Sequence, residues 1–253
     1  MDLEIDRRDR VLVLRINRPE VRNALSPEVV RGLGKALMSA DADEAVRAVV
    51  ITGTGDRAFC AGMDLRAFAA ADSSDRSVDD AYLSFIRHGI AKPVIAAANA
   101  TAVAGGFELL LACDLAVAAS DARFGLPEVK RGLFAAAGGM QLGRRIPLAV
   151  ALELALTGDL IDAERAQELG LLNFVVAREQ VLDAALGLAA RISANGPLAV
   201  RTTKRLIRDA IYSSREQAWA QQDSVFDDVF ASADAKEGAL AFVEKRQPQW
   251  TGT

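Results

Sequence analysis

The stretch Ala45-Val-Arg-Ala-Val-Val-Ile-Thr52 is rich in β-branched and small apolar residues. Such a run is typical of a strand that is buried within a parallel sheet. The stretch Lys92-Pro-Val-Ile-Ala-Ala-Ala98 predicts a second buried strand of the same kind. These two stretches predict the centre of a sheet in an α/β core.

Helices alternate with these strands along the first half of the chain. Ser26-Pro27-Glu28 predicts a helix start, because it combines a capping serine, a proline at the first helical position and an acid in the first turn. That helix is expected to end near Ala40. A second, amphipathic helix is expected near 79–90, and a third begins at Gly105-Gly106. Further strands are predicted at 11–16, 114–118 and 173–176.

Helical periodicity dominates after Gly138. The clearest break is Asn195-Gly196-Pro197, where glycine and proline interrupt the pattern and only helical periodicity follows. We therefore expect a core over 1–195 and a helical C-terminal region over 196–253. Within that region, basic residues recur at helical spacing and are expected to form a solvated or subunit-facing surface. They are Arg201, Lys204, Arg205 and Arg208.

Composition limits the class of protein. The chain has 253 residues, of which 51% are hydrophobic and 25% charged, so it can bury a large core and is not intrinsically disordered. Its net charge of −4 argues against a nucleic acid or an anionic membrane as a partner. The apolar run 109–119 is interrupted by Asp114 and is too short to span a bilayer. No apolar segment follows Met1, which predicts no signal peptide.

The few cysteines and histidines exclude several kinds of chemistry. Cys60 and Cys113 cannot form a disulfide framework, and we expect them to be small core residues in a cytoplasmic protein. His88 is the single histidine, so a His-rich metal site is excluded and no metal is expected. A Ser-His-Asp mechanism would depend on this one residue, which lies in a plain amphipathic stretch. If the chain is an enzyme, carboxylates and backbone donors are its expected catalytic groups.

One glycine motif invites a nucleotide-binding interpretation. Gly53-Thr-Gly55-Asp-Arg-Ala58 follows a strand and fits a loose dinucleotide fingerprint. That fingerprint requires a helix to begin at once and hold the pyrophosphate at its N-terminus. Here Phe59-Cys60-Ala61-Gly62 follows instead and predicts another turn. We interpret the motif as an ordinary glycine turn.

Two glycine-containing stretches are candidates for backbone chemistry. Cys60-Ala61-Gly62-Met63-Asp64-Leu65 predicts a turn after a strand, which can leave an N–H group unpaired. Ala104-Gly105-Gly106-Phe107-Glu108 opens a helix, where the first N–H groups lack partners within the helix. Glycine there allows a ligand carbonyl to approach closely. If both donors met one oxygen they would form an oxyanion hole, although turns and helix starts are ordinarily rich in glycine.

Two glutamates stand beside such turns. Glu108 lies in the first turn of an otherwise apolar helix, where the helix dipole alone would explain an acid. Its apolar neighbours nevertheless suggest that the side chain points into the protein. Glu128 follows Phe124-Gly-Leu-Pro127 at a strand-to-helix turn, where an acid is also common. Two carboxylates facing one apolar pocket would have different pKa values, but spacing alone does not bring them together.

The order of these motifs resembles the enoyl-CoA hydratase/isomerase (crotonase) superfamily. The resemblance extends over nearly the whole chain, and each motif is weak alone while the set is highly specific. The matching stretches are Asn17-Arg-Pro-Glu-Val-Arg-Asn-Ala-Leu25, Ala58-Phe-Cys-Ala-Gly-Met-Asp-Leu65, Lys92 to Ala98, Ala104-Gly-Gly-Phe-Glu-Leu109, Ala112-Cys-Asp-Leu115, Phe124-Gly-Leu-Pro-Glu128, Leu156-Thr-Gly-Asp159 and Ala241-Phe-Val-Glu-Lys-Arg246.

The resemblance implies a spiral of repeated ββα units followed by a helical trimerisation region, commonly in trimers or dimers of trimers. It implies an enoyl-CoA hydratase that needs no cofactor, because coenzyme A is part of the substrate. The backbone N–H groups of Met63 and Gly105 match the oxyanion donors, and Glu108 and Glu128 match the catalytic glutamates. The positions implied for CoA or substrate binding are Arg22, Ala24, Ala61, Met63, Asp64, Leu65, Arg66, Gly105, Pro127, Ala136, Phe242 and Lys245.

Departures from the family pattern leave the acyl group open. Ala135 and Ala136 stand where similar hydratases carry a Pro-Gly pair, so the pocket floor changes shape. Met63 is bulkier than the alanine common at its position. Alternatives of the same family are a Δ3-Δ2 enoyl-CoA isomerase, a carnityl-CoA dehydratase and a thioester hydrolase. Alternatives of another class are a non-catalytic acyl-CoA-binding member and an RNA-binding member.

Overall fold

The structure is a computed structural model that describes residues 1–64 and 79–253. Within these residues, a main sheet has the strand order β1-β2-β3-β4-β6-β9 and a smaller sheet has the order β5-β7-β8. The main sheet contains β1 (Leu3–Arg8), β2 (Val11–Ile16), β3 (Ala48–Gly53), β4 (Val94–Ala98), β6 (Leu115–Ala119) and β9 (Phe174–Val176). The smaller sheet contains β5 (Ala102–Val103), β7 (Arg123–Gly125) and β8 (Ile161–Asp162).

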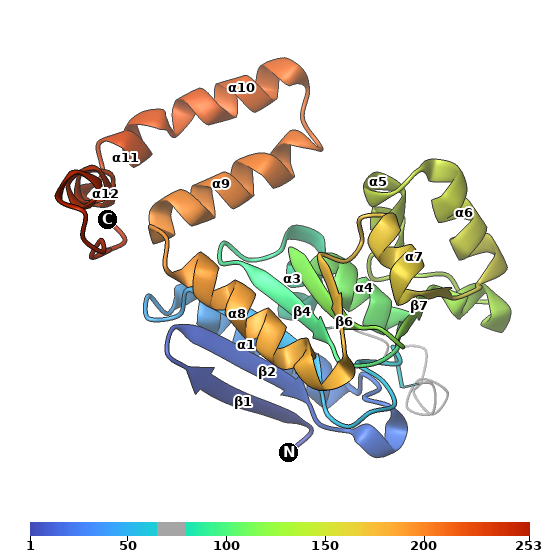
Figure 1. Cartoon of the computed structure of the whole chain (residues 1–253). Coiled ribbons are helices and arrows are strands. Elements are labelled where there is room, and N and C mark those ends of the chain that lie inside the picture. The colour runs from blue at the N-terminus through green and yellow to red at the C-terminus, as the bar shows by residue number, and fades with distance from the viewer. Residues whose placement is uncertain (65–78) are drawn as a thin grey trace.

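The main sheet is covered by helices on both faces (Figure 1). β1 pairs with β2 in antiparallel fashion, and all the other neighbours are parallel. β3 and β4 are buried at every residue, which explains why their sequences are continuously apolar. α8 (Val181–Ser193) packs on one face, and α1 (Pro27–Ala42), α3 (Asp80–His88) and α4 (Gly105–Ala112) lie on the other. The predicted α/β core is confirmed.

The chain winds as a spiral in which each turn contributes to both sheets. β4 and β6 pair in the main sheet, while β5 and β7, which directly follow them in the chain, pair in the smaller sheet. An isolated parallel bridge between Cys60 and Ala102 joins the segment after β3 to β5 of the smaller sheet. α4 closes one such strand–strand–helix unit. Corresponding stretches of successive turns therefore lie side by side.

Most predicted elements occur within a few residues of their expected bounds. Ser26 caps α1, since its side chain accepts from the Val29 N–H at 3.3 Å. The helix ends at Ala42, one half-turn beyond the predicted end. The prediction missed β1 and the three short strands β5, β7 and β8. Strands of two or three residues are too short to produce a periodic pattern.

The second half of the described chain is mainly helical, as expected. Next to the core it contains α5 (Leu142–Arg145), α6 (Leu148–Thr157) and α7 (Ala163–Glu168). The C-terminal arm contains α9 (Pro197–Ala210), α10 (Arg215–Ser224), α11 (Phe226–Phe230) and α12 (Ala233–Glu244). Figure 1 shows this arm extending away from the main sheet. No helix among the described residues is long and apolar enough to cross a bilayer.

The expectation for the basic stripe on α9 is wrong in part. Lys204 and Arg208 were expected to face solvent or a neighbouring subunit. Both instead form ion pairs with Asp114 of the core. The Lys204 ammonium lies 2.6 Å from one carboxylate oxygen of Asp114, and the Arg208 guanidinium lies 2.9 Å from the other. The sequence shows a helix periodicity, but it does not show which acid the helix meets. These ion pairs anchor α9 to the core.

Candidate active site

Three short segments meet at the carboxyl ends of the central strands. Cys60 pairs with Ala102 through a parallel bridge, and Ala102 pairs with Phe124 through the β5–β7 ladder. The segments continue from there into Met63, into the start of α4 and into a 3-10 helix, Pro127–Arg131. The spiral thus brings together the three stretches that the sequence analysis had singled out separately.

The amides of Met63 and Gly105 are neighbours. A Cβ atom at Gly105 would lie 3.5 Å from the Met63 nitrogen and 3.4 Å from the Gly62 Cα. Neither N–H finds an acceptor among the described residues, although the flanking amides do: Asp64 N–H donates to the Leu25 carbonyl and Ala104 N–H donates to the Gly125 carbonyl. Two adjacent unpaired donors are what an oxyanion hole requires.

Backbone conformation keeps these amides close together. Gly62 has a φ of 84°, and a Cβ there would approach the Gly105 nitrogen to 2.7 Å. Ala104 has a φ of 52° and a ψ of −133° immediately before α4. This is a conformation that glycine adopts easily and alanine does not. Strain of this kind concentrates at functional sites, and here it orients the first N–H of the helix.

Glu108 is buried and held by backbone amides. Its side chain is drawn inward as expected, with the residue 4% exposed. Oε1 accepts from Gly138 N–H at 2.6 Å and from Gly139 N–H at 2.8 Å. Burial raises the pKa of this carboxyl above its usual value of 4.5, and the hydrogen bonds from the 137–139 backbone oppose that rise. The group is therefore fixed in position and easier to protonate than an ordinary glutamate.

Glu128 is half-buried and keeps one oxygen unused. Its Oε2 is shielded from solvent and has no hydrogen-bond partner among the described residues. Burial is the main cause that raises the pKa of Glu128, and the nearby charge of Glu108 raises it further. Glu108 therefore lies near enough to Glu128 for its charge to act on that carboxyl.

Several predicted binding residues surround the turn that carries Met63. Ala61 N–H donates to the carbonyl of Arg22 at 3.1 Å, and Arg22 itself is exposed with a φ of 57°. Ala24 is buried, and its carbonyl accepts from the Arg18 guanidinium at 2.7 Å. Arg18 also pairs with Asp64 at 3.2 Å. These contacts join the loop after β2 to the loop after β3.

Other predicted residues lie elsewhere or beyond description. Pro127 directly precedes Glu128 and is half-buried, whereas Ala136 is exposed on the loop that leads to Gly138. Phe242 and Lys245 lie at the end of α12, which stands apart from α4 within this chain (Figure 1). Leu65 and Arg66 lie outside the described residues.

The sequence analysis missed the groups that position the site. It gave no role to Gly138 and Gly139, whose amides hold Glu108. It also passed over Asn23, a fully buried side chain that donates to the carbonyls of Thr54 and Ala58 and accepts from Arg18 N–H. The available signals were the Gly-Gly pair after an alanine run and a polar residue within an expected turn. Neither signal indicates which group the glycine amides or the Asn23 side chain would contact.

The two cysteine thiols and the single histidine make none of the contacts described above. Cys60 and Cys113 are buried free thiols, as expected, and burial raises the pKa of each to about 12. His88 is exposed at the end of α3. The described residues contain no group of three or more His, Cys, Asp or Glu side chains arranged to hold a metal. No helix begins in the described segment 53–64, so the dinucleotide fingerprint lacks its required helix.

Comparison with known proteins assigns the family. The sequence profile of the enoyl-CoA hydratase/isomerase family matches residues 6–253. The chain is 41% identical to "Enoyl-CoA hydratase EchA19" of Mycobacterium tuberculosis, covering 98% of this chain and 96% of that protein. It is 36% identical to "Carnitinyl-CoA dehydratase" of Proteus mirabilis, covering 99% of this chain and 98% of that protein.

Solved structures support the same assignment. The crystal structure of enoyl-CoA hydratase EchA1 from Mycobacterium marinum superposes with a TM-score of 0.95 at 49% identity, covering 100% of this chain and 99% of that one. The fold is therefore of the crotonase type, with the helical C-terminal region that the resemblance implied. This chain belongs to the enoyl-CoA hydratase/isomerase family.

Proposed function

We propose that this chain catalyses the reversible addition of water to a trans-2-enoyl-CoA, giving a 3-hydroxyacyl-CoA. The observation that carries the proposal is the pair of adjacent amides, Met63 and Gly105, that find no acceptor among the described residues. Glu108 lies one turn further along α4 from Gly105, and its charge acts on Glu128. The similarity to enoyl-CoA hydratases over nearly the whole chain supports the same reaction.

The amides act on the thioester carbonyl in this proposal. Its oxygen accepts from Met63 and Gly105, which makes the β-carbon electrophilic and stabilises the negative charge that develops on the oxygen. In other enzymes, one such donor contributes roughly 2.7–4 kcal/mol to the transition state. The donors lie on backbone that Gly62 and Ala104 hold in place, so no reorganisation is needed during the reaction.

The carboxylates act on the water and the proton. Glu108 takes a proton from water as its oxygen bonds to the β-carbon, and Glu128 gives a proton to the α-carbon. Burial, and to a lesser extent the charge of Glu108, raises the pKa of Glu128, which favours the protonated form of Glu128 that gives up this proton. Acid–base catalysis by positioned groups contributes about 10²–10⁴-fold. No cofactor beyond the CoA of the substrate takes part.

CoA binds, in this proposal, along the turn that carries Ala61, Met63 and Asp64, with Arg22 beside it. The exposure of Arg22 next to the turn supports a contact with the CoA phosphates. Leu65 and Arg66 belong to the same proposed surface by sequence alone. We also propose a cytoplasmic location, as the sequence predicts.

A second candidate is dehydration of a polar 3-hydroxyacyl-CoA such as a carnitinyl thioester. The similarity to carnitinyl-CoA dehydratase favours it. It uses the same catalytic groups in the opposite direction. Comparing turnover of crotonyl-CoA with that of a carnitinyl thioester separates the two candidates.

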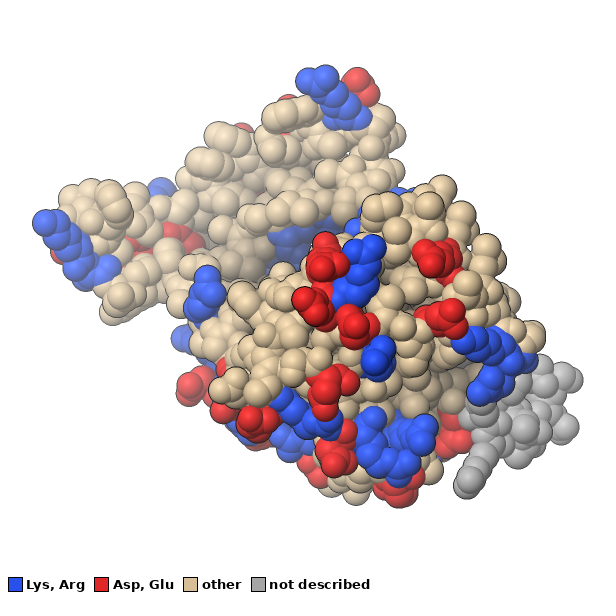
Figure 2. Space-filling view, turned by 45° about the vertical axis from the view of Figure 1, so that its right-hand side comes forward, with Lys and Arg blue, Asp and Glu red and all other residues tan. Residues whose placement is uncertain are grey.

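We further propose that the chain assembles as a homotrimer or a dimer of trimers through 196–253. The arm exposes large apolar side chains, and Figure 2 shows a mostly uncharged face above a hollow between arm and core. Exposed large apolar side chains that gather on one part of a protein are typical of a subunit interface. Examples are Ile207, Ile211, Trp219, Phe226, Phe230, Phe242 and Val243. Phe242 and Lys245 would then reach the CoA site of a neighbouring subunit. Light scattering after size-exclusion chromatography measures the assembly, and a monomer would contradict this proposal.

The decisive experiment follows loss of absorbance of crotonyl-CoA for the wild type, Glu108→Gln and Glu128→Gln. We expect turnover by the wild type and a loss of about 10²–10⁴-fold in each variant. Glu153→Gln is the matched control, because Glu153 is exposed on α6, and it should retain full activity. Activity that survives Glu108→Gln would indicate isomerase-like chemistry through Glu128 alone.

A further inference from the structure

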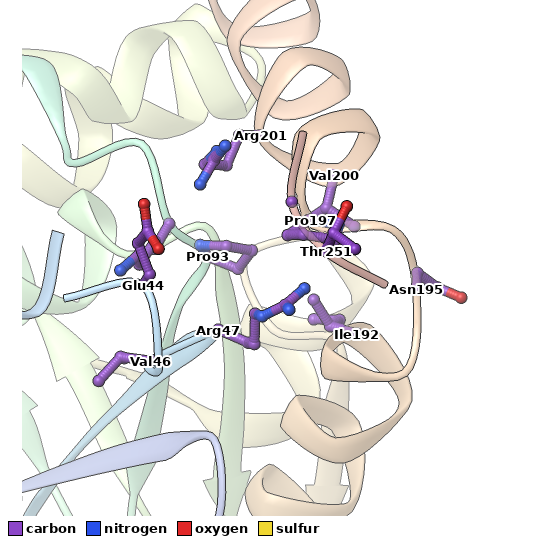
Figure 3. Close-up of a pocket in the computed structure, with 12 residues that line it drawn as sticks. Glu44, Val46, Arg47, Pro93, Ile192, Asn195, Pro197, Val200, Arg201 and Thr251 are labelled. Carbon is purple, nitrogen blue, oxygen red and sulfur yellow. The ribbon is translucent and has the colours of Figure 1, made fainter. Parts of the chain in front are cut away.

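A small cavity lies at the opposite end of the main sheet from the two glutamates. Arg47 directly precedes β3, and Lys92-Pro93 directly precede β4, whereas the candidate active site follows the other ends of these strands. The cavity has a volume of about 60 Å³ and is closed by Arg201 of α9 and by Thr251 near the C-terminus (Figure 3). By the same measure, one water molecule needs about 10–15 Å³. The space therefore holds more than a single water.

Arg47 brings an unsatisfied guanidinium to this cavity. Its Nε and Nη1 atoms are shielded from solvent and have no hydrogen-bond partner among the described residues. Buried donors on a charged group are expensive to leave unpaired, and native structures almost always satisfy them with protein, water or an ion. Some group from outside the chain is therefore expected to accept from Arg47.

Positive charge accumulates around the same space. Arg201 faces the cavity from α9 and forms no ion pair within the part of the chain that the structure describes. Burial is the main cause that lowers the pKa of Arg47; the charges of Arg10 and Arg201 lower it further, and the charge of Asp234 opposes them. Lys92 also lines the cavity, but its ammonium donates to the carbonyls of Ala40 and Asp43 near the end of α1. The two arginines are thus the donors left for a ligand.

The nearby acids are committed to other partners. The carboxylate of Asp234 accepts from Thr251 N–H at 2.7 Å, from the Thr251 hydroxyl at 3.0 Å and from Gly252 N–H at 3.0 Å. Asp41 accepts from the Lys92 N–H at 3.1 Å. Asp43 accepts from Ala45 N–H and pairs with Arg7.

Glu44 is the remaining acid that lines the cavity. It is exposed at the mouth and makes no ion pair with either arginine. No described carboxylate therefore neutralises Arg47 by direct contact.

We propose that this cavity binds a small tetrahedral oxyanion, such as phosphate or sulfate, between Arg47 and Arg201. Such an anion supplies several acceptor oxygens, which match the planar donor array of a guanidinium. Because Arg47 belongs to the core and Arg201 to α9, the anion holds the C-terminal arm against the sheet. The site is separate from the CoA site, since it lies at the other end of the strands.

Thermal unfolding of the full-length protein tests this proposal. The protein is saturated with CoA, so that phosphate-binding groups in the CoA site are occupied, and sulfate replaces chloride at constant ionic strength. We expect the Tm of the wild type to rise saturably, by roughly 5–10 °C at a hundredfold excess over the Kd. Arg201→Gln should abolish the saturable rise. Arg205→Gln, an exposed residue on the same helix that does not line the cavity, should retain it.

Arg47→Gln provides the second, independent variant. Without sulfate its Tm should equal or exceed that of the wild type, because an unpaired desolvated charge has been removed. With sulfate it should fall below the wild type. An equal rise in the wild type and Arg201→Gln would show only a general salt effect, and no saturable rise would show that water fills the cavity. Either result overturns the proposal. A crystal grown with selenate would locate the anion by its anomalous signal.

Discussion

Glu108 and Glu128 are the same residue type in two different settings. Glu108 lies in the first turn of α4, is almost fully buried and has one oxygen fixed by two amides. Glu128 lies on a short 3-10 turn, is half-buried and keeps a shielded oxygen without a partner among the described residues. The first carboxylate is held in place, and the second is left free to bind. This difference fits the proposed roles, in which Glu108 holds the water and takes its proton while Glu128 gives a proton to the α-carbon.

The largest effect is expected from combining the two substitutions. If both glutamates act on one water and one substrate, Glu108→Gln and Glu128→Gln are not additive. We expect the double variant to fall no more than about tenfold below the poorer single variant, after single losses of about 10²–10⁴-fold. Steady-state rates of crotonyl-CoA hydration by the wild type, the two single variants and the double variant measure this non-additivity. Losses that multiply would show that the two carboxylates act in separate steps.

A smaller effect is expected from disturbing only the held carboxylate. A Cβ at Gly139 would lie 2.2 Å from the Ala135 Cβ, so Gly139→Ala must displace an amide that holds Glu108. Misplacement of this kind should lower kcat by up to about 10²-fold while CoA binding persists. Activity equal to the wild type would mean that this amide does not position Glu108.

Gly187→Ala is the matched control for that substitution. Gly187 is exposed inside α8, and a Cβ there would meet nothing within 4 Å. Its activity should be unchanged, and its stability should rise by about 0.5–1 kcal/mol, because alanine favours a helix over glycine.

The smallest effect is expected on the thermal stability of Glu128→Gln, and its sign distinguishes Glu128 from an ordinary surface acid. The pKa of Glu128 is raised on folding, so its favourable contribution is present below its usual pKa of 4.5 and is lost as the pH rises through the higher folded value. Glu128→Gln removes this loss. We therefore expect its Tm to exceed that of the wild type by about 2 °C at neutral pH, with the difference disappearing near pH 4.

Glu28 provides a control of the opposite sign. Its own backbone amide and Ser26 lower its pKa, so its contribution is present at neutral pH and is lost on acidification. Glu28→Gln should lower the Tm at neutral pH and have less effect in acid. Calorimetric scans of both variants between pH 4 and pH 8 would contradict this account if their shifts had the same sign.

The sequence predicted what depends on local pattern. β3 and β4 were predictable because strands covered on both faces are continuously apolar, and α1 was predictable from its serine cap. The inward direction of Glu108 was predictable from its apolar neighbours. The pairing of Met63 with Gly105 came from resemblance, because their contact depends on how successive turns of the spiral stack.

What the sequence did not predict depends on contacts across the chain. Gly138 and Gly139 lie in a loop without periodicity, and nothing in their neighbourhood indicates that they hold Glu108. Lys204 and Arg208 looked like a free basic stripe because Asp114 is distant in sequence. Arg47 looked like one polar residue in an apolar strand, and its lack of a partner became visible only when the helices were in place.

The stacked turns of the spiral also set an order of events during synthesis. A nascent chain folds from its N-terminus as it emerges from the ribosome. Every group of the proposed active site within one subunit, from Met63 to Gly139, emerges before α9 to α12 have been made. The catalytic end can therefore form on the ribosome while the arm is still absent. In the proposed assembly, the subunits join after this site has formed.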